Sequence, residues 1–267
     1  MSVIVYILTD NPESTKVQRT SSLFENGLFQ VNVCNIRPPK DTITSPHMST
    51  ADVLEFYRFT WCLNDAKNKW PEHHVIIAQD TCVSIADSDT IADAIRQTMI
   101  KKKWDILYLC RWLDRCEDNT DNERLDGYTG YIVRTFSPHG LQALMFSPTG
   151  RDKILGQKIM NNGKFFAKKE TYPLDNMLNQ HIQDGDLTAY AVGNNLIEYD
   201  LTQARDRTDY ARSAQCQVPN PTNKNSSSEG FSVWIYIGIA VLVAVLIIIA
   251  VLIAKDDGIK SDHPMMQ

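Results

Sequence analysis

Residues 3–34 read VIVYILTDNPESTKVQRTSSLFENGLFQVNVC, and this stretch decides the fold. It contains an apolar run at Val3–Leu8, a polar segment at Ser14–Asn26 and an alternating run at Phe29–Cys34. The pattern predicts a strand, a helix capped by its first serine and ended before Gly27, and a second strand. Because strand–helix–strand units close by a right-handed crossover, we expect a parallel pair of strands covered on both faces.

The same alternation continues along the first 215 residues. We expect further strands at His74–Gln79, Asp105–Cys110, Tyr128–Arg134 and Leu187–Val192, and an extended segment at Asn195–Asp200. We expect helices from Ser49-Thr50 to Trp70 and at Ile91–Lys102, Gly140–Met145 and Asp175–Gln183, with an exposed loop at Arg111–Asp126. Strands that alternate with helices predict an α/β domain with a mostly parallel sheet flanked by helices.

An apolar segment further along the chain predicts one C-terminal transmembrane helix. Val233–Ala254 (VWIYIGIAVLVAVLIIIAVLIA) holds 22 consecutive residues without a charge. A helix of that length is about 33 Å long, enough to cross a hydrocarbon core of about 30 Å. Residues 216–232 are rich in Pro, Asn and Ser and are expected to form a flexible linker. We therefore expect an α/β domain at 1–215, this linker, the transmembrane helix and a short polar tail at 255–267.

The first residues, MSVIVYILTDNPES, have no basic start, and their apolar run is too short for a signal peptide. A single apolar span near the end of such a chain is typical of tail-anchored proteins. We therefore expect a single-pass membrane protein, with Val233–Ala254 in the lipid bilayer and the globular domain in the cytosol.

Charge and cysteine content exclude some classes of protein. The formal net charge is −5 and the only basic run is Lys101–Lys103, so a nucleic acid is not expected as a partner. The six cysteines include no CxxC pair. They are expected to be buried free thiols in a reducing compartment, and neither a zinc site nor a disulfide scaffold.

Polar residues follow three of the expected strands, at Thr9-Asp10-Asn11, Gln79-Asp80-Thr81 and Arg111. Open α/β sheets bind ligands beyond the carboxyl ends of their strands. A nucleotide-sugar enzyme places an acidic residue at such a strand tip to hold a hard divalent cation, which neutralises the diphosphate leaving group. Asp80 is the candidate for this position, and the alternative is that it only caps a turn.

Six segments, in order over about residues 3–210, resemble those of glycosyltransferase family 25, the lipopolysaccharide and collagen β-galactosyltransferase type. They are VIVYILTDNPESTKVQRTSSLFENGL, HHVIIAQDTCVSIADS, WDILYLCRW, GYTGYIVRTFSPHGLQALM, TYPLDNML and LTAYAVGNNLIEYDLTQARDRTDY. The resemblance implies a nucleotide-sugar-transferase (GT-A-like) fold. It also implies transfer of a hexose from a nucleotide-diphosphate donor, such as UDP-galactose or UDP-glucose, with Mn²⁺ or Mg²⁺ as cofactor.

The resemblance also implies roles for particular residues. Asp10, Asn11 and Arg19 are expected to bind the donor, and otherwise to stabilise a turn and a helix face. Asp80 is expected to bind the donor and the metal ion. Asp175, in the Pro-x-Asp motif, is expected to be the catalytic base that takes a proton from an acceptor hydroxyl, and otherwise an ordinary helix N-cap.

The chain departs from the family where chemistry is expected. The family's Glu-Asp-Asp triplet reads Gln79-Asp80-Thr81, and a Ser-His pair is missing from EFYRFTWCL at 55–63. Two functions remain open. One is a membrane-anchored glycosyltransferase that acts on a glycan, a lipid-linked sugar or a protein hydroxyl. The other is an inactive domain of the same fold that binds structural protein partners as a membrane-anchored scaffold, for example in a virion, as a viral family member with a degenerate acidic motif.

Overall fold

The computed structural model describes residues 2–39, 48–111, 114–126, 130–156, 160–161, 164–165, 173–193 and 196–200. The chain divides into two units, residues 1–218 and 219–267, and all described residues belong to the first unit. The predicted linker, the predicted transmembrane helix Val233–Ala254 and the predicted tail lie outside the described residues. Within the described ranges, no helix combines the length and the apolar character that a membrane span requires.

Strands and helices alternate along the first unit, as predicted. Their order is β1 (Val3–Leu8), α1 (Thr15–Ser22), β2 (Phe29–Cys34), α2 (Thr50–Lys69), β3 (Val75–Gln79), β4 (Cys82–Ser84), α3 (Ser88–Lys101), β5 (Ile106–Tyr108), the 3-10 helix η1 (Cys116–Asp118), β6 (Thr120–Arg124), β7 (Tyr131–Thr135), β8 (Ala143–Phe146), α4 (Pro148–Leu155), β9 (Met160–Asn161), β10 (Lys164–Phe165), α5 (Leu174–Gln183), β11 (Ala189–Val192) and β12 (Ile197–Tyr199). The two strands of the opening unit have the predicted bounds, residue for residue.

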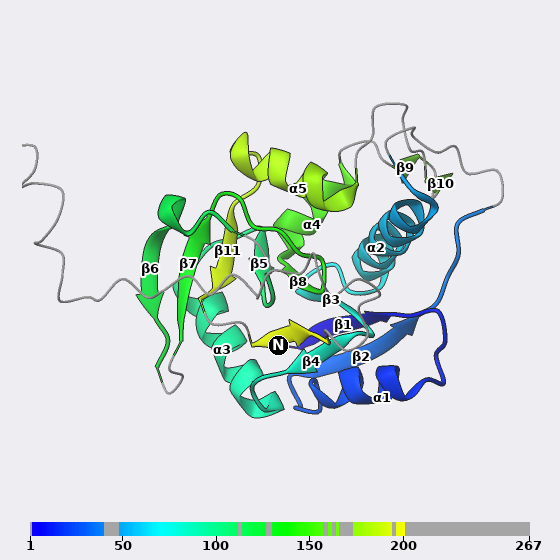
Figure 1. Cartoon of the computed structure of the whole chain (residues 1–267), viewed down its shortest axis with the longest axis horizontal. Coiled ribbons are helices and arrows are strands. Elements are labelled where there is room, and N and C mark those ends of the chain that lie inside the picture. Colours follow the sequence, from blue (N-terminus) through cyan, green and yellow to red (C-terminus); the bar gives the residue numbers. More distant parts are fainter. Residues whose placement is uncertain are drawn as a thin grey trace, which may run out of the picture. The chain divides into compact units, whose positions relative to one another are not determined.

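Eight strands of the described chain form one sheet, in the order β2-β1-β3-β8-β5-β11-β7-β6 (Figure 1). β1 pairs in parallel with β2 and β3, and β5 pairs in parallel with β11. β8 runs opposite to β3 and β5, and β7 runs opposite to β11 and β6. Only β7 and β8 therefore oppose the common direction of this sheet, which confirms the predicted α/β class.

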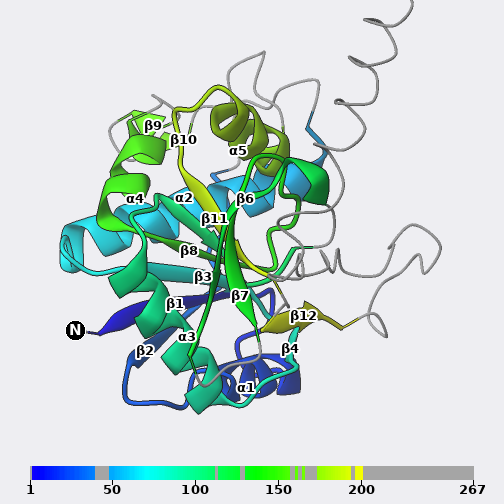
Figure 2. The same ribbon diagram turned by 90° about the vertical axis from the view of Figure 1, so that its left-hand side faces the viewer.

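Helices cover both faces of the sheet. α2, α4 and α5 lie on one side, and α1 and α3 lie on the other, as Figure 2 shows from a second direction. The side chains of β1 divide accordingly: Ile4 and Tyr6 belong to the core cluster beneath α2 and α5. Val3, Val5 and Ile7 belong to the cluster beneath α1 and α3. Because both faces are buried, the strand is apolar at every position.

The helix predicted at Gly140–Met145 is wrong, because the second half of this segment belongs to strand β8 and the first half is not helical. All four residues of Ala143–Phe146 are buried, and they pair with β3 on one side and β5 on the other. A short apolar run covered on both faces shows neither strand nor helix periodicity. The helix that follows is α4, which begins after Ser147, whose Oγ accepts a hydrogen bond from the Gly150 N–H at 3.0 Å.

The exposed loop predicted at Arg111–Asp126 is also partly wrong. This stretch contains η1 and the strand β6, which pairs with β7 in antiparallel fashion at one edge of the sheet. The residues of β6, TDNER, are polar and mostly exposed, so their composition resembles that of a loop. Charged side chains are a common feature of edge strands, which carry unpaired backbone groups on one side.

The cysteine prediction is confirmed at four positions and wrong at one. Cys34, Cys62, Cys82 and Cys110 are buried free thiols. Cys116 is disulfide-bonded, contrary to the prediction. Disulfide partners are set by proximity in the fold and not by spacing along the chain, so the absence of a CxxC pair could not reveal this bond.

Gly150 allows α4 to pass directly over the backbone at the start of β5. A Cβ at this position would lie 2.1 Å from the Asp105 carbonyl oxygen. We predict that Gly150→Ala lowers the free energy of unfolding by about 1–3 kcal/mol, because the helix or the strand must shift. Chemical unfolding of the full chain measures this change. Gly27→Ala, where a Cβ would meet nothing within 4 Å, is the control, and equal losses in both variants would contradict the prediction.

Candidate functional site

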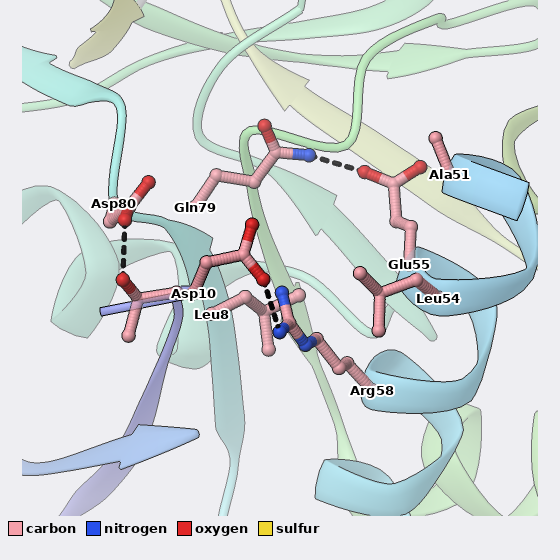
Figure 3. Close-up of a pocket in the computed structure, with 9 residues that line it drawn as sticks. Leu8, Asp10, Ala51, Leu54, Glu55, Arg58, Gln79 and Asp80 are labelled. Atoms are coloured by element: carbon pink, nitrogen blue, oxygen red, sulfur yellow. Dashed lines mark hydrogen bonds and ion pairs between the residues drawn. The ribbon is translucent and has the colours of Figure 1, made fainter. Parts of the chain in front are cut away.

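A cleft of about 210 Å³ lies at the carboxyl ends of β1 and β3, the sheet edge at which the sequence places its candidate residues. Strand ends and one helix supply its lining, which is Leu8, Thr9, Asp10, Gln79 and Asp80 with Ala51, Leu54, Glu55 and Arg58 from α2. Figure 3 shows Glu55 and Arg58 reaching from the helix toward the strand ends. The structure thus brings together Asp10 and Asp80, two of the residues predicted to bind a donor.

Asp80 is held against the turn that follows β1. Its Oδ2 accepts a hydrogen bond from Thr9 Oγ1 at 2.5 Å, and its backbone N–H donates to the Leu8 carbonyl at 3.0 Å. Thr20 Oγ1 of α1 donates to the Asp80 carbonyl at 3.1 Å. These contacts tie the end of β3 to both β1 and α1, so the Asp80 carboxylate has a fixed orientation in the wall of the cleft.

Asp10 and Arg58 form an ion pair across the cleft (Figure 3). Arg58 Nη2 donates to Asp10 Oδ1 at 2.7 Å, and Arg58 Nε donates to the Ile36 carbonyl at 2.9 Å. The two partners differ in exposure, since the side chain of Arg58 is 7% exposed and that of Asp10 is 70% exposed. The guanidinium is therefore held in the protein interior, whereas the carboxylate of its partner faces solvent.

Glu55 is a half-buried acid that accepts a hydrogen bond from Gln79 Nε2. Burial raises the pKa of Glu55 to about 7, and repulsion by Asp175 and Asp52 adds to the increase. The hydrogen bond from Gln79 acts in the opposite direction. A carboxyl group that exchanges its proton near neutral pH is suited to act as a general acid or base.

Asp175 lies near the same edge, in the first turn of α5. Its Oδ2 lies 2.9 Å from His139 Nδ1, and its Oδ1 accepts a hydrogen bond from the Gly140 N–H at 3.1 Å. The hydrogen bond with Asp175 raises the pKa of His139. Pro173 occupies the N-cap position of α5, so the alternative that Asp175 caps the helix is wrong. Its carboxylate instead fixes the segment that leads into β8.

Two of the predicted donor-binding residues do not line the cleft. Arg19 Nη1 forms an ion pair with Asp200 at 2.8 Å. Asn11 builds the turn after β1, where its Oδ1 accepts a hydrogen bond from the Glu13 N–H at 3.2 Å. The donor-binding roles of Arg19 and Asn11 remain predictions. Arg111, the polar residue expected at the end of a third strand, is also absent from the cleft lining. Its side chain is fully buried in an ion pair with Asp114.

The residues of the cleft do not fit a divalent metal ion. In the part of the chain that the structure describes, no group of three or more His, Cys, Asp or Glu side chains could hold one. Asp80 and Glu55 each accept a hydrogen bond from the protein, and the guanidinium of Arg58 would repel a dication. The Mn²⁺ or Mg²⁺ predicted at Asp80 stays a prediction that this donor set does not support.

The sequence analysis does not predict Glu55 and Arg58 as residues of the site. They lie three residues apart on α2 and therefore on the same face of the helix. Phe59 and Cys62 of this face are buried, as is Arg58 itself. Lys, Glu, Arg and Asp are rarely buried unless they are paired. Charged residues among the apolar positions of a long helix are thus the signal that could have identified them.

No family model matches the chain, and no curated protein matches it. Among solved structures, the crystal structure of A197 from STIV matches with a TM-score of 0.38 and 12% identity, over 72% of this chain and 81% of that chain. The resemblance to glycosyltransferase family 25 stays a prediction.

The raised pKa of Glu55 predicts a pH dependence of stability. The unfolded chain ionises first, near pH 4.5, so the free energy of unfolding falls as the pH rises from there to about 7. Glu55→Gln keeps an acceptor for Gln79 and removes this loss. We expect it to increase the free energy of unfolding at pH 8 by on the order of 1–3 kcal/mol. Chemical unfolding between pH 4 and 8 tests this, with Glu13→Gln in the exposed turn as control; parallel pH profiles of wild type and Glu55→Gln would contradict it.

The contact between Asp175 and His139 predicts a change that NMR can measure. Asp175→Asn removes the charge that favours the imidazolium, so the pKa of His139 should fall. A titration of the imidazole signal in the full chain measures the change. Asp184→Asn removes the same charge at the other end of α5 and should leave the signal unaltered. If both variants titrate like the wild type, the contact does not form in solution.

Proposed function

We propose that this protein is a membrane-anchored, glycosyltransferase-like protein that binds a nucleotide-diphosphate sugar in the cleft. It would transfer the hexose to a hydroxyl group of a glycan, a lipid-linked sugar or a protein. The order of the strands and the helices on both faces are compatible with a GT-A-like fold. The observation that carries the proposal is the placement of a guanidinium and of carboxyl groups from several elements at one carboxyl edge of the sheet.

The proposed reaction assigns separate tasks to these groups. Asp175, oriented by His139 and Gly140, would take the proton from the acceptor hydroxyl. The hydroxyl oxygen then forms a bond to the anomeric carbon of the hexose as the bond to the nucleoside diphosphate breaks. Glu55, with its pKa of about 7, is available near the site as a second proton donor or acceptor. Asp80 would accept hydrogen bonds from hydroxyl groups of the donor.

A second candidate function is a structural one, in which the same fold has lost catalysis. Gln79 supplies an amide where the family carries a carboxylate, and this amide is bound to Glu55. Asp10 is likewise bound to Arg58. A cleft whose polar groups bind one another needs no ligand to be stable. This observation favours a membrane-anchored scaffold protein with structural protein partners, for example in a virion.

The proposed anchor is the apolar segment Val233–Ala254, with the globular domain on the cytosolic side. In a glycosyltransferase, it would hold the cleft near an acceptor in the same membrane. In a scaffold, it would link a membrane to a protein layer. Protease sensitivity of the full chain inserted in microsomes distinguishes the two orientations, because only a domain outside the vesicles is digested.

Thermal unfolding of the full chain in detergent, with a panel of nucleotide-sugars, tests the proposed function. A donor present at 100 times its dissociation constant stabilises the native state by about 2.7 kcal/mol, which corresponds to a shift of roughly 5–10 °C. We expect such a shift with a UDP-hexose, its loss in Asp80→Ala, and its retention in Asp93→Ala, an exposed site on α3. Each donor is measured with and without manganese. No shift with any donor, from a folded chain, would favour the scaffold.

A further inference from the structure

Arg58 is the buried cation of the cleft, and its partner is poorly buried. The Arg58 side chain is 7% exposed, whereas that of Asp10 is 70% exposed. The backbone carbonyl of Ile36 fixes the guanidinium from one side through Nε at 2.9 Å. Asp10 occupies Nη2 at 2.7 Å, on the side where both residues line the cleft. A ligand that enters the cleft therefore meets the guanidinium together with a carboxylate already bound to it.

The two partners respond differently when the pair is broken. Asp10 can turn into water at little cost, because most of its side chain is already hydrated. Arg58 cannot, because a buried charge that loses its partner keeps the penalty of desolvation. The pair is thus stable until another anion replaces the carboxylate on the guanidinium. An exchange of anions is the change that the geometry permits.

We propose that the diphosphate of the donor replaces the Asp10 carboxylate on Arg58, so that this guanidinium neutralises the leaving group in place of a divalent metal. The identity of the ligand rests on the proposed function. A guanidinium offers parallel N–H groups that match two oxygens of one phosphate, which the single ammonium group of a lysine does less well. The cleft does not fit a metal, so a resident cation is the group that remains to bind a diphosphate.

The other groups of the cleft make the exchange necessary. Asp10, Glu55 and Asp80 line the same cleft as Arg58, so three carboxyl groups share the cleft with one guanidinium. An anion would be repelled if all three stayed ionised and in place. Rotation of Asp10 into water moves one charge away from the guanidinium and screens it, and the pKa of Glu55, about 7, allows that group to be neutral. Asp80 is bound by the Thr9 hydroxyl at 2.5 Å, and in this proposal its carboxylate accepts hydrogen bonds from the sugar hydroxyls.

Calorimetric binding of UDP-glucose, UDP-galactose and inorganic pyrophosphate to the full chain tests the exchange, in EDTA and in manganese. Asp10→Asn removes the competing charge but keeps an oxygen that can accept the hydrogen bond from Arg58 Nη2, so we expect the variant to fold, and thermal unfolding checks this. We expect this variant to bind the ligands about threefold to tenfold more tightly than the wild type, in EDTA as well. Glu13→Gln changes the net charge equally, lies outside the cleft lining and should leave the affinity unaltered.

Arg58 variants test the same exchange from the other side. Arg58→Lys keeps the charge but lacks the planar fork, and we expect it to weaken binding about tenfold. Thermal unfolding of each variant shows whether it is folded. The Asp10→Asn comparison remains decisive if the arginine variants do not fold, because it predicts a gain in affinity.

The possible results separate this inference from the proposed function. Binding in EDTA that Asp10→Asn strengthens and Glu13→Gln does not would support both. Binding that requires manganese, or that Asp10→Asn weakens, would overturn the role of Arg58 and leave a donor site standing. No binding of any of the three ligands to the folded wild type or to Asp10→Asn would overturn both.

Discussion

The reversed direction of strand β8 fixes the positions of the segments before and after it. The strand lies between β3 and β5 and runs against both, so it starts at the sheet edge where those strands end. The Gln79 N–H donates to the Gln142 carbonyl at 2.8 Å, which locks the entry of β8 to the end of β3. As a result, His139 and Gly140 come to the carboxyl edge, where Asp175 binds them. At the other end of β8, helix α4 begins directly over the backbone of Asp105.

The electrostatics of the cleft follow from where α2 lies. The helix begins with a capping box formed by Ser49 and Asp52, and its first turns face the ends of β1 and β3. Packing against the sheet stabilises this helix and also desolvates Glu55 and Arg58. A desolvated acid tends to hold its proton and a desolvated base needs a counter-ion, which explains the raised pKa of Glu55 and the pairing of Arg58. The fold thus sets the protonation of Glu55 and the pairing of Arg58 in the cleft.

How far the sequence predicts this protein depends on the kind of residue. Periodicity and caps identified β1, β2 and α2, because each combines a clear apolar pattern with a recognisable boundary. The same approach failed at Ala143–Phe146, where a strand buried on both faces has no periodicity. The site divides in the same way. Asp10 and Asp80 were predicted as site residues because they follow buried strands. Glu55 and Arg58 were missed because they lie inside a helix.

Local patterns and the direction of the strands are enough to predict the α/β class, the opening strand–helix–strand unit and the sheet edge at which polar residues gather. The sequence also shows that residues 233–254 carry no charged side chain, and the membrane span predicted there lies outside the described residues. Only the tertiary structure decided that β8 is reversed, that Arg58 pairs with Asp10 and that Asp175 binds His139. These features join residues that are at least 36 positions apart in the chain, and no local pattern encodes which buried groups meet.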